Sequence, residues 1–178
     1  MIRFGEDVCG NLDSAVRREW LETNGIGRFA SGTINECNTR RSHGLLVAAA
    51  MLSKLEETLI VNGRGHELGT NRYPGVLHPQ GFEFLTQFRL DPFPTFTFSV
   101  DGVQIEKKLF MPHRQNTTVI KYTLTKTGIE AHVELELRPL IAFRDYHSLT
   151  HENGAIDRRT LNAVAQQVGE PKSKRAAG

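Results

Sequence analysis

The sequence predicts an all-β protein, an antiparallel sandwich, and three observations lead to this fold class. The strongest hydrophobic period is two residues: in residues 128–139 (GIEAHVELELRP) apolar and polar side chains alternate, as in a half-buried strand. Several other short runs alternate in the same way or are rich in β-branched residues. Turn residues recur at short intervals between these runs, which indicates many short strands in an antiparallel sandwich.

The first part of the chain is predicted to hold one helix and three strands. The helix covers Ser14–Leu21, with Asp13 as its N-terminal cap. Strands are expected around Ala30–Asn35, Gly44–Ala50 and Thr58–Val61.

The second part is predicted to hold the remaining strands. One is expected around Phe82–Leu90, and residues 95–100 (TFTFSV) alternate phenylalanine or valine with polar side chains. Asp101-Gly102 is a hairpin turn signal before residues 103–111 (VQIEKKLFM), a further strand. Residues 117–124 (TTVIKYTL) form the strand before the one at residues 128–139. The other turn signals are Asn62-Gly63, Tyr73-Pro74-Gly75, His78-Pro79, Asp91-Pro92 and Phe93-Pro94.

Length and composition favour one globular domain. The 178 residues can bury a real core, and 39% of them are hydrophobic while 24% are charged. No apolar stretch reaches the roughly 18–20 residues that span a bilayer, and no signal peptide is recognised, so we expect a cytoplasmic protein without a membrane partner. Cys9 and Cys37 are too far apart for a metal or redox pair and are expected to be buried, reduced thiols.

The C-terminal residues differ from the rest in composition. The net charge of +2 comes from basic residues after Gly154, so it does not indicate a nucleic-acid partner for the folded part. A second short helix can cover Arg158–Val168, and the last residues (GEPKSKRAAG) lack apolar side chains and are expected to be disordered. We therefore divide the chain into a β-sandwich domain at residues 1–157 and a divergent basic tail at residues 158–178.

Several motifs for cofactor or catalytic sites are rejected. Gly25-x-Gly27-x-x-Ala30 fits a loose dinucleotide fingerprint, but a predicted strand follows it where a helix is required. No phosphate-binding loop and no metal-ligand spacing of histidines is present, so no metal site is expected. Glu56 and Glu57, at the start of a predicted strand, point to opposite faces and do not form a glycosidase carboxylate pair.

Two polar clusters remain as candidate sites. The first consists of Asn38, Arg40, Arg41 and His43; the second, around residues 138–147, contains Arg138, Arg144, Asp145, Tyr146 and His147. Arginine, histidine and aromatic groups suit the hydroxyl-rich face of a sugar, because they donate in fixed directions and stack on its apolar side. The alternative is an ion-pair network at a domain interface, with Arg144–Asp145 or Arg41–Glu57 as members.

Taken together, six segments resemble one family. They are REWLETNGIGRFASGT, NTRRSHGLLVAA, LEETL, NRYPGVLHPQGFEFLTQFRLDPFPTF, IEKKLFM and LRPLIAFRDYHSLTHENG. In this order and spacing they are similar to the N-terminal domain of the bacterial and archaeal glycogen debranching enzymes, the amylo-α-1,6-glucosidases. The similarity covers roughly residues 15–157.

The resemblance implies an antiparallel supersandwich, a galactose-mutarotase-like β-sandwich with one or two short helices, ahead of an (α/α)6 barrel. In such enzymes the barrel carries the acid and base carboxylates that cut the α-1,6-linked glucose at a branch point. This chemistry needs no organic cofactor, so the resemblance implies no cofactor. Since this sequence ends before a barrel could begin, we expect no catalytic residue in it and no activity of the chain alone. The implied partners are an α-glucan, such as glycogen or a branched dextrin, and a helical-barrel catalytic domain in cis or from an adjacent gene.

In this setting both polar clusters become candidate substrate-binding residues: Asn38, Arg40, Arg41, His43, Arg144, Asp145 and His147. The alternatives are contact with the barrel domain, a stand-alone carbohydrate-binding sandwich, or a truncated fragment without activity. The sequence departs from the family at Arg28, where a second glycine is usual, and at Ser42, where a tyrosine is usual. It also leaves the family pattern after Asp157, which is compatible with a truncated, frameshifted or split gene.

Overall fold

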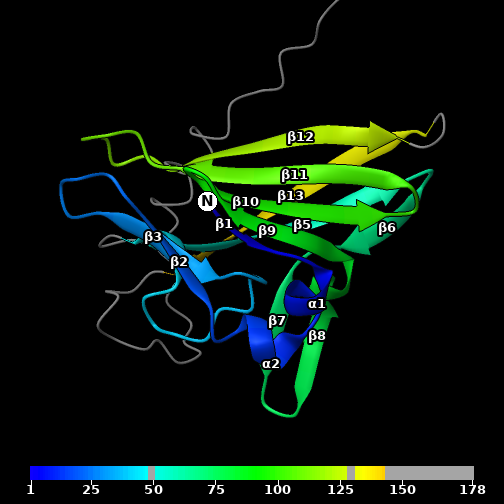
Figure 1. Ribbon diagram of the computed structural model, residues 1–178, viewed down its shortest axis with the longest axis horizontal. Coiled ribbons are helices and arrows are strands. Elements are labelled where there is room, and N and C mark those ends of the chain that lie inside the picture. Colours follow the sequence, from blue (N-terminus) through cyan, green and yellow to red (C-terminus); the bar gives the residue numbers. More distant parts are fainter. Residues whose placement is uncertain (48–50, 128–130, 143–178) are drawn as a thin grey trace, which may run out of the picture.

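The computed structural model describes residues 1–47, 51–127 and 131–142, and all structural statements concern these ranges (Figure 1). Strands account for 58% and helices for 9%, which confirms the all-β class. The elements form two larger sheets and one separate hairpin, and every strand pairing is antiparallel.

The first sheet has the strand order β1-β9-β10-β11-β12. Its members are β1 (Ile2–Phe4), β9 (Leu85–Leu90), β10 (Pro94–Val100), β11 (Val103–Phe110) and β12 (Val119–Thr127). In β11, buried and half-buried residues alternate along the whole strand, as the period of two predicted. One face of this sheet therefore points into the core.

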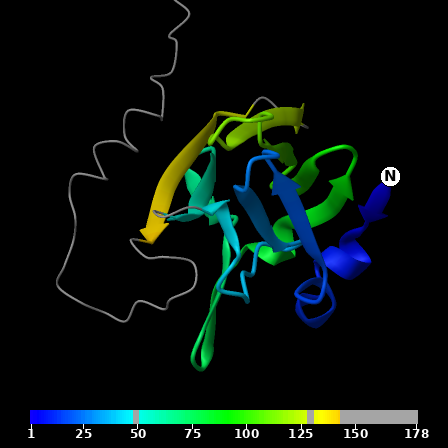
Figure 2. The same cartoon turned by 90° about the vertical axis from the view of Figure 1, so that its left-hand side faces the viewer.

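The second sheet has the order β13-β5-β4-β3-β2, and β6 also pairs with β5. Its members are β2 (Glu19–Thr23), β3 (Phe29–Thr33), β4 (Gly44–Val47), β5 (Met51–Val61), β6 (Arg64–Glu67) and β13 (Val133–Ala142). The strands β7 (Thr70–Tyr73) and β8 (Val76–Gln80) form a hairpin of their own. This hairpin extends away from both larger sheets (Figures 1 and 2).

Three short helical turns occur in the described parts of the chain. They are α1 (Glu6–Cys9), α2 (Leu12–Ala15) and the 3-10 turn η1 (Gly81–Phe84). Among the described residues, the helices are far too short and polar to cross a bilayer. The predicted helix at 158–168 and the predicted disordered tail lie outside the described residues.

The hydrophobic core lies between the two larger sheets. Trp20 of β2 packs edge-to-face on Phe96 of β10, with 6.2 Å between ring centroids. Phe96 in turn contacts Phe88 of β9 at 5.1 Å. Around these rings the core is aliphatic, with Ala30, Ile34, Leu45, Leu59, Val61, Val103, Ile105 and Leu109 among its members. Both cysteines are buried free thiols, and burial raises the pKa of Cys9 to about 11.

The predicted hairpin turns are confirmed by backbone geometry. Asn62 and Gly63 between β5 and β6 have φ of 51° and 82°, and Asp101 and Gly102 between β10 and β11 have φ of 47° and 80°. Two successive positive φ values define the type I′ turn, whose twist matches that of the flanking strands. Asn, Asp and Gly tolerate this conformation, so local sequence determines these two hairpins.

Several predicted bounds are wrong. No helix covers Ser14–Leu21: α2 ends at Ala15, and its N-terminal cap is Asn11, whose Oδ1 accepts from Ser14 N at 2.9 Å, instead of Asp13. Trp20 belongs to β2, because pairing with β3 lets its indole donate to Thr33 O (3.2 Å) and reach Phe96. Tertiary packing here overrides the local helical pattern.

Other strand predictions need smaller corrections. The strand expected from Phe82 begins only at Leu85, after the 3-10 turn. The strand expected at Thr58–Val61 starts at Met51, so Glu56 and Glu57 lie in mid-strand. Of Gly44–Ala50, residues 44–47 form β4, and residues 48–50 lie outside the described residues.

Asn24 joins the turn between β2 and β3 to the loop that precedes β12. Its Nδ2 donates to Gln115 O and to Asn116 Oδ1, both at 2.9 Å. Its Oδ1 accepts from the backbone N–H groups of Ile26 (3.0 Å) and Arg28 (3.1 Å). The side chain is fully buried, so all of its hydrogen-bonding capacity serves this junction.

We expect Asn24→Ala to lower the free energy of unfolding by about 2–4 kcal/mol, because it leaves several buried backbone groups without partners. Urea titration followed by tryptophan fluorescence measures the change. Asn116→Ala, which removes a single partially exposed contact to the same amide, is the control and should cost less than about 1 kcal/mol. Equal losses in the two variants would contradict the assigned role of Asn24.

Candidate functional site

The loop between β3 and β4 holds the first polar cluster, and it divides into a buried and an exposed half. Ile34, Asn35, Glu36 and Cys37 are buried, whereas the side chains of residues 38–41 are exposed. The same loop thus reaches into the core with its first half and presents hydrogen-bond donors to solvent with its second half.

The buried half is a tight turn held by side-chain hydrogen bonds. The Thr33 hydroxyl lies 2.9 Å from Asn35 Oδ1 and 3.1 Å from Cys37 O, and Cys37 N donates to Asn35 Oδ1 at 3.3 Å. Glu36 has a φ of 59°, in the left-handed region that non-glycine residues rarely adopt. This conformation directs the Glu36 carboxylate toward the core between the sheets.

The Glu36 carboxylate forms an ion pair with a buried lysine, Lys107. Lys107 Nζ lies 2.5 Å from Glu36 Oε1 and 2.5 Å from Glu57 Oε1, and only 2% of the Lys107 side chain is exposed. The Tyr122 hydroxyl donates to Glu57 Oε1 at 2.6 Å. These four residues, which we call the Lys107 cluster, are Glu36 of the β3–β4 loop, Glu57 of β5, Lys107 of β11 and Tyr122 of β12. The Lys107 cluster therefore joins both sheets to the loop.

The protonation state of each residue in the Lys107 cluster depends on its burial and on the charges of its neighbours. Burial alone would lower the pKa of Lys107, but the two carboxylates outweigh it and the pKa is raised, so the ammonium keeps its charge. Burial raises the pKa of Glu57 despite the opposing effect of Lys107. Burial and the neighbouring Glu57 charge raise the pKa of Tyr122, so its hydroxyl remains a donor. The cluster is closed to solvent and therefore holds the fold together instead of meeting a substrate.

The exposed half of the loop is tied to β2. Arg40 Nε pairs with Glu19 Oε1 at 2.6 Å. His43 Nδ1 accepts from the backbone N–H groups of Thr39 (3.1 Å) and Arg40 (3.3 Å), and its Nε2 lies 3.5 Å from Glu19 Oε1. Burial lowers the pKa of His43, so the ring is neutral. Because Nδ1 accepts hydrogen bonds, the proton of the neutral ring is on Nε2. His43 thereby links the two ends of the exposed segment.

The structure therefore separates the predicted residues of the first cluster. Asn38, Arg40 and Arg41 lie exposed on one short segment, while His43 is 3% exposed and faces inward. Of the second cluster, Arg144, Asp145 and His147 lie outside the described residues, as does Tyr146. Arg138 is described on β13, where it lies 3.7 Å from Glu67 Oε1.

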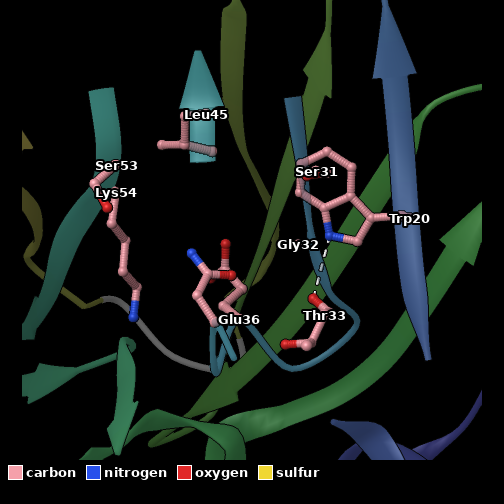
Figure 3. Close-up of a pocket in the computed structure, with 9 residues that line it drawn as sticks. Trp20, Ser31, Gly32, Thr33, Glu36, Leu45, Ser53 and Lys54 are labelled. Atoms are coloured by element: carbon pink, nitrogen blue, oxygen red, sulfur yellow. Dashed lines mark hydrogen bonds between the residues drawn. The ribbon is translucent and has the colours of Figure 1, made fainter. Parts of the chain in front are cut away.

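A small cavity lies beneath the loop. It is lined by Trp20 and Lys54 on opposite sides, with Glu36 between them (Figure 3). Its volume of ≈ 10 Å³ is about that of one water position, whereas small-molecule sites measure some hundreds of Å³. The cavity is too small for a sugar, so a ligand of this loop has to contact its exposed surface. The described residues contain no group of three or more His, Cys, Asp or Glu side chains that could hold a metal ion.

The sequence reasoning missed the Lys107 cluster, although one signal for it was present. Lys107 stands two residues after Ile105 and two before Leu109, on the face that alternation assigns to the core. A lysine at such a position requires an anionic partner in the core. The prediction that Glu56 and Glu57 point to opposite faces is confirmed, since Glu57 reaches Lys107 while Glu56 Oε1 accepts from Asn71 Nδ2 at 2.8 Å.

One comparison with known proteins gave a match. The family model described as "Glycogen debranching enzyme N terminal" matches residues 18–176. No curated protein and no solved structure matched the chain.

We expect Lys107→Met to destabilise the fold by about 3–5 kcal/mol, because it leaves Glu36 and Glu57 buried without a cation. Adding Glu36→Gln and Glu57→Gln should recover much of this loss, since the buried charges are then removed together. Urea unfolding of the two variants measures both changes. A free energy of unfolding for Lys107→Met within about 1 kcal/mol of the wild-type value would contradict the buried ion pair.

The raised pKa values predict a loss of stability at alkaline pH. The folded chain keeps protons on Tyr122 and Lys107 that the unfolded chain releases above their ordinary pKa values of 10.0 and 10.5. The free energy of unfolding should therefore fall as pH rises above about 10, by at most about 1.4 kcal/mol per pH unit for each group. Unfolding titrations at several alkaline pH values should show a shallower fall for Tyr122→Phe. An unchanged slope in this variant would refute the assignment.

Proposed function

The chain belongs to the family of glycogen debranching enzyme N-terminal domains, and we propose that it is a non-catalytic domain that assists α-glucan binding and docks to a helical-barrel catalytic domain. The family match over residues 18–176 is the observation that carries this proposal. A cytoplasmic location and a role in the breakdown of glycogen or branched dextrins are part of it. The amylo-α-1,6-glucosidase chemistry itself is assigned to the barrel.

The chemistry of the β3–β4 loop supports a glucan as ligand. Asn38, Arg40 and Arg41 bring one amide and two guanidinium groups to the same short exposed segment. A guanidinium presents several N–H donors in one plane, which suits neighbouring hydroxyl groups on a sugar ring. Because glucan hydroxyls are uncharged, such contacts depend on geometry more than on net charge.

The frame beneath the loop supports a binding role as well. Glu36 is anchored by Lys107, and His43 holds two backbone N–H groups of the exposed segment. A ligand site gains affinity when its donors are ordered before binding, since less conformational entropy is lost. We therefore assign His43 to positioning, and Asn38, Arg40 and Arg41 to contact with the glucan.

Ser42 stands where the family usually has a tyrosine, so this position cannot supply an aromatic stacking contact. Its carbonyl instead accepts from the Ser31 hydroxyl at 2.9 Å, which links the loop to β3. If Arg144, Asp145 and His147 take part in the site, they do so from the segment that follows β13. The proposal for these three residues stands on the resemblance alone.

Binding measurements distinguish the proposed role from its alternatives. A stand-alone carbohydrate-binding sandwich binds glycogen and maltooligosaccharides without a partner. A domain that only completes a debranching enzyme gains this affinity when the helical-barrel domain is added, and an inactive fragment binds in neither case. Affinity electrophoresis in glycogen gels, with and without the barrel domain, separates the three outcomes.

We expect Arg41→Ala to weaken glucan binding about ten- to a hundredfold, which corresponds to the loss of one charge-assisted hydrogen bond of roughly 1.5–3 kcal/mol. An exposed loop substitution should change stability by only about 0.5 kcal/mol. Arg41→Lys should restore part of the affinity, because the charge remains while the planar fork is lost.

The matched control is Arg64→Ala, an exposed arginine at the start of β6, which pairs with β5 and not with β3 or β4. It should leave both affinity and melting temperature unchanged. If Arg41→Ala lowers the melting temperature strongly while affinity per folded molecule stays constant, Arg41 has a structural role and the glucan assignment of this loop is wrong.

A further inference from the structure

A second polar surface lies away from the β3–β4 loop, where β5, β6 and β13 meet the β7–β8 hairpin. Two hollows of ≈ 260 Å³ and ≈ 300 Å³ adjoin there and share Glu67, His78 and Pro79 in their linings. Together they reach the size range of small-molecule sites. We propose that these hollows form a saccharide-binding groove, distinct from the β3–β4 loop.

Two parts of the chain build this groove: the consecutive elements β5 to β8 and the distant strand β13. Glu56 of β5 faces outward, because its neighbour Glu57 faces the core. Arg138 of β13 is paired directly opposite Glu56, and Glu67 of β6 is paired opposite Thr58. The hairpin adds Asn71, Tyr73 and His78 from its own side.

The floor of the groove is already ordered. Lys54 Nζ donates to Thr70 O and to Asn71 Oδ1, both at 2.9 Å, and Asn71 Nδ2 donates to Glu56 Oε1 at 2.8 Å. Lys54 and Glu56 are themselves 3.7 Å apart. Each of these hydrogen bonds orients the next side chain, so the Asn71 amide and the Glu56 carboxylate are held in place before a ligand binds.

The rim, in contrast, is only loosely paired. Arg138 lies 3.7 Å from Glu67 and 3.6 Å from Glu136, and His78 lies 3.7 Å from Glu67. These distances exceed those of good hydrogen bonds, and exposed ion pairs of this kind contribute about 0–1 kcal/mol. A ligand hydroxyl can therefore replace such a contact at little cost.

Tyr73 supplies an apolar platform beside these polar groups. It is the last residue of β7, directly before the Pro74-Gly75 turn, and 51% of it is exposed. Gly75 has a φ of 78°, in the left-handed region that this turn requires and that glycine adopts without strain. An exposed ring next to amide, carboxylate and guanidinium groups matches a pyranose, which has one apolar face and a rim of hydroxyls.

The mixed charge of the groove selects among ligand classes. The lining carboxylates Glu56, Glu67 and Glu83 oppose phosphate or nucleic acid, while the guanidinium of Arg138 opposes a metal cation. Donors and acceptors of both signs suit an uncharged polyhydroxyl compound. The choice of an α-glucan within this class rests on the proposed function, whereas the saccharide groove rests on the geometry alone.

The test uses the full chain and three soluble probes: glycogen, maltoheptaose and cellohexaose. Isothermal titration or affinity electrophoresis compares the wild type with Tyr73→Ala, Tyr73→Phe and Arg138→Gln. We expect Tyr73→Ala and Arg138→Gln each to weaken binding about tenfold, and Tyr73→Phe to stay within about twofold, because the ring is retained. Val76→Ala is the matched control, since Val76 lies on the same hairpin, is equally exposed and does not line the hollows.

Each outcome has a distinct meaning. If Tyr73→Ala binds as tightly as the wild type while Arg41→Ala does not, the groove is refuted and the proposed function stands. If cellohexaose but neither α-glucan binds in a Tyr73-dependent manner, the groove stands and the proposed function falls. Equal losses in Val76→Ala and Tyr73→Ala would refute the groove, because Val76 does not line the hollows, and a wild type that binds none of the probes would also overturn it.

Discussion

The ammonium group of Lys107, held between two buried carboxylates, is the interaction on which the arrangement of this sandwich depends. It meets Glu57 across the interface between the sheets and Glu36 from the β3–β4 loop, each at 2.5 Å. Removing three charged groups from water is costly, and their mutual attraction offsets this cost only when all are in place. The cluster therefore specifies one arrangement of β5, β11, β12 and the loop more than it adds net stability.

The same cluster fixes the register of β11. A shift by one residue would move Lys107 to the outer face and bring Glu106 and Lys108 into the core, where neither has a partner of this kind. Glu106 in the observed register pairs with Arg89 of β9 on the other face at 2.9 Å. The observed register of β11 thus forms ion pairs on both faces of the strand, and a register shifted by one residue loses the ion pairs on both faces.

The proposed loop site and the proposed groove differ in how they would present polar groups to a ligand. In the loop, exposed donors at residues 38–41 stand on a buried turn that Glu36 and His43 hold from below. In the groove, the ordered Lys54–Asn71–Glu56 floor lies beneath a loosely paired rim and an exposed tyrosine. With both proposed sites occupied, two weak contacts on one domain would raise the overall affinity for a branched polymer, which offers several chains to one molecule.

The sequence by itself determined the features that depend on neighbouring residues. Alternation predicted β10, β11 and β13 and hence the all-β class, while Asn62-Gly63 and Asp101-Gly102 predicted their hairpins because they tolerate positive φ. The sequence also grouped Asn38, Arg40, Arg41 and His43 into one polar cluster, of which the structure exposes the first three. Only the tertiary structure decided the strand at Trp20, the burial of His43, the Lys107 cluster and the groove. Lys107 and Glu36 are 71 residues apart, and Arg138 and Glu56 belong to different parts of the chain, so no local pattern can pair them before the strands have found their partners.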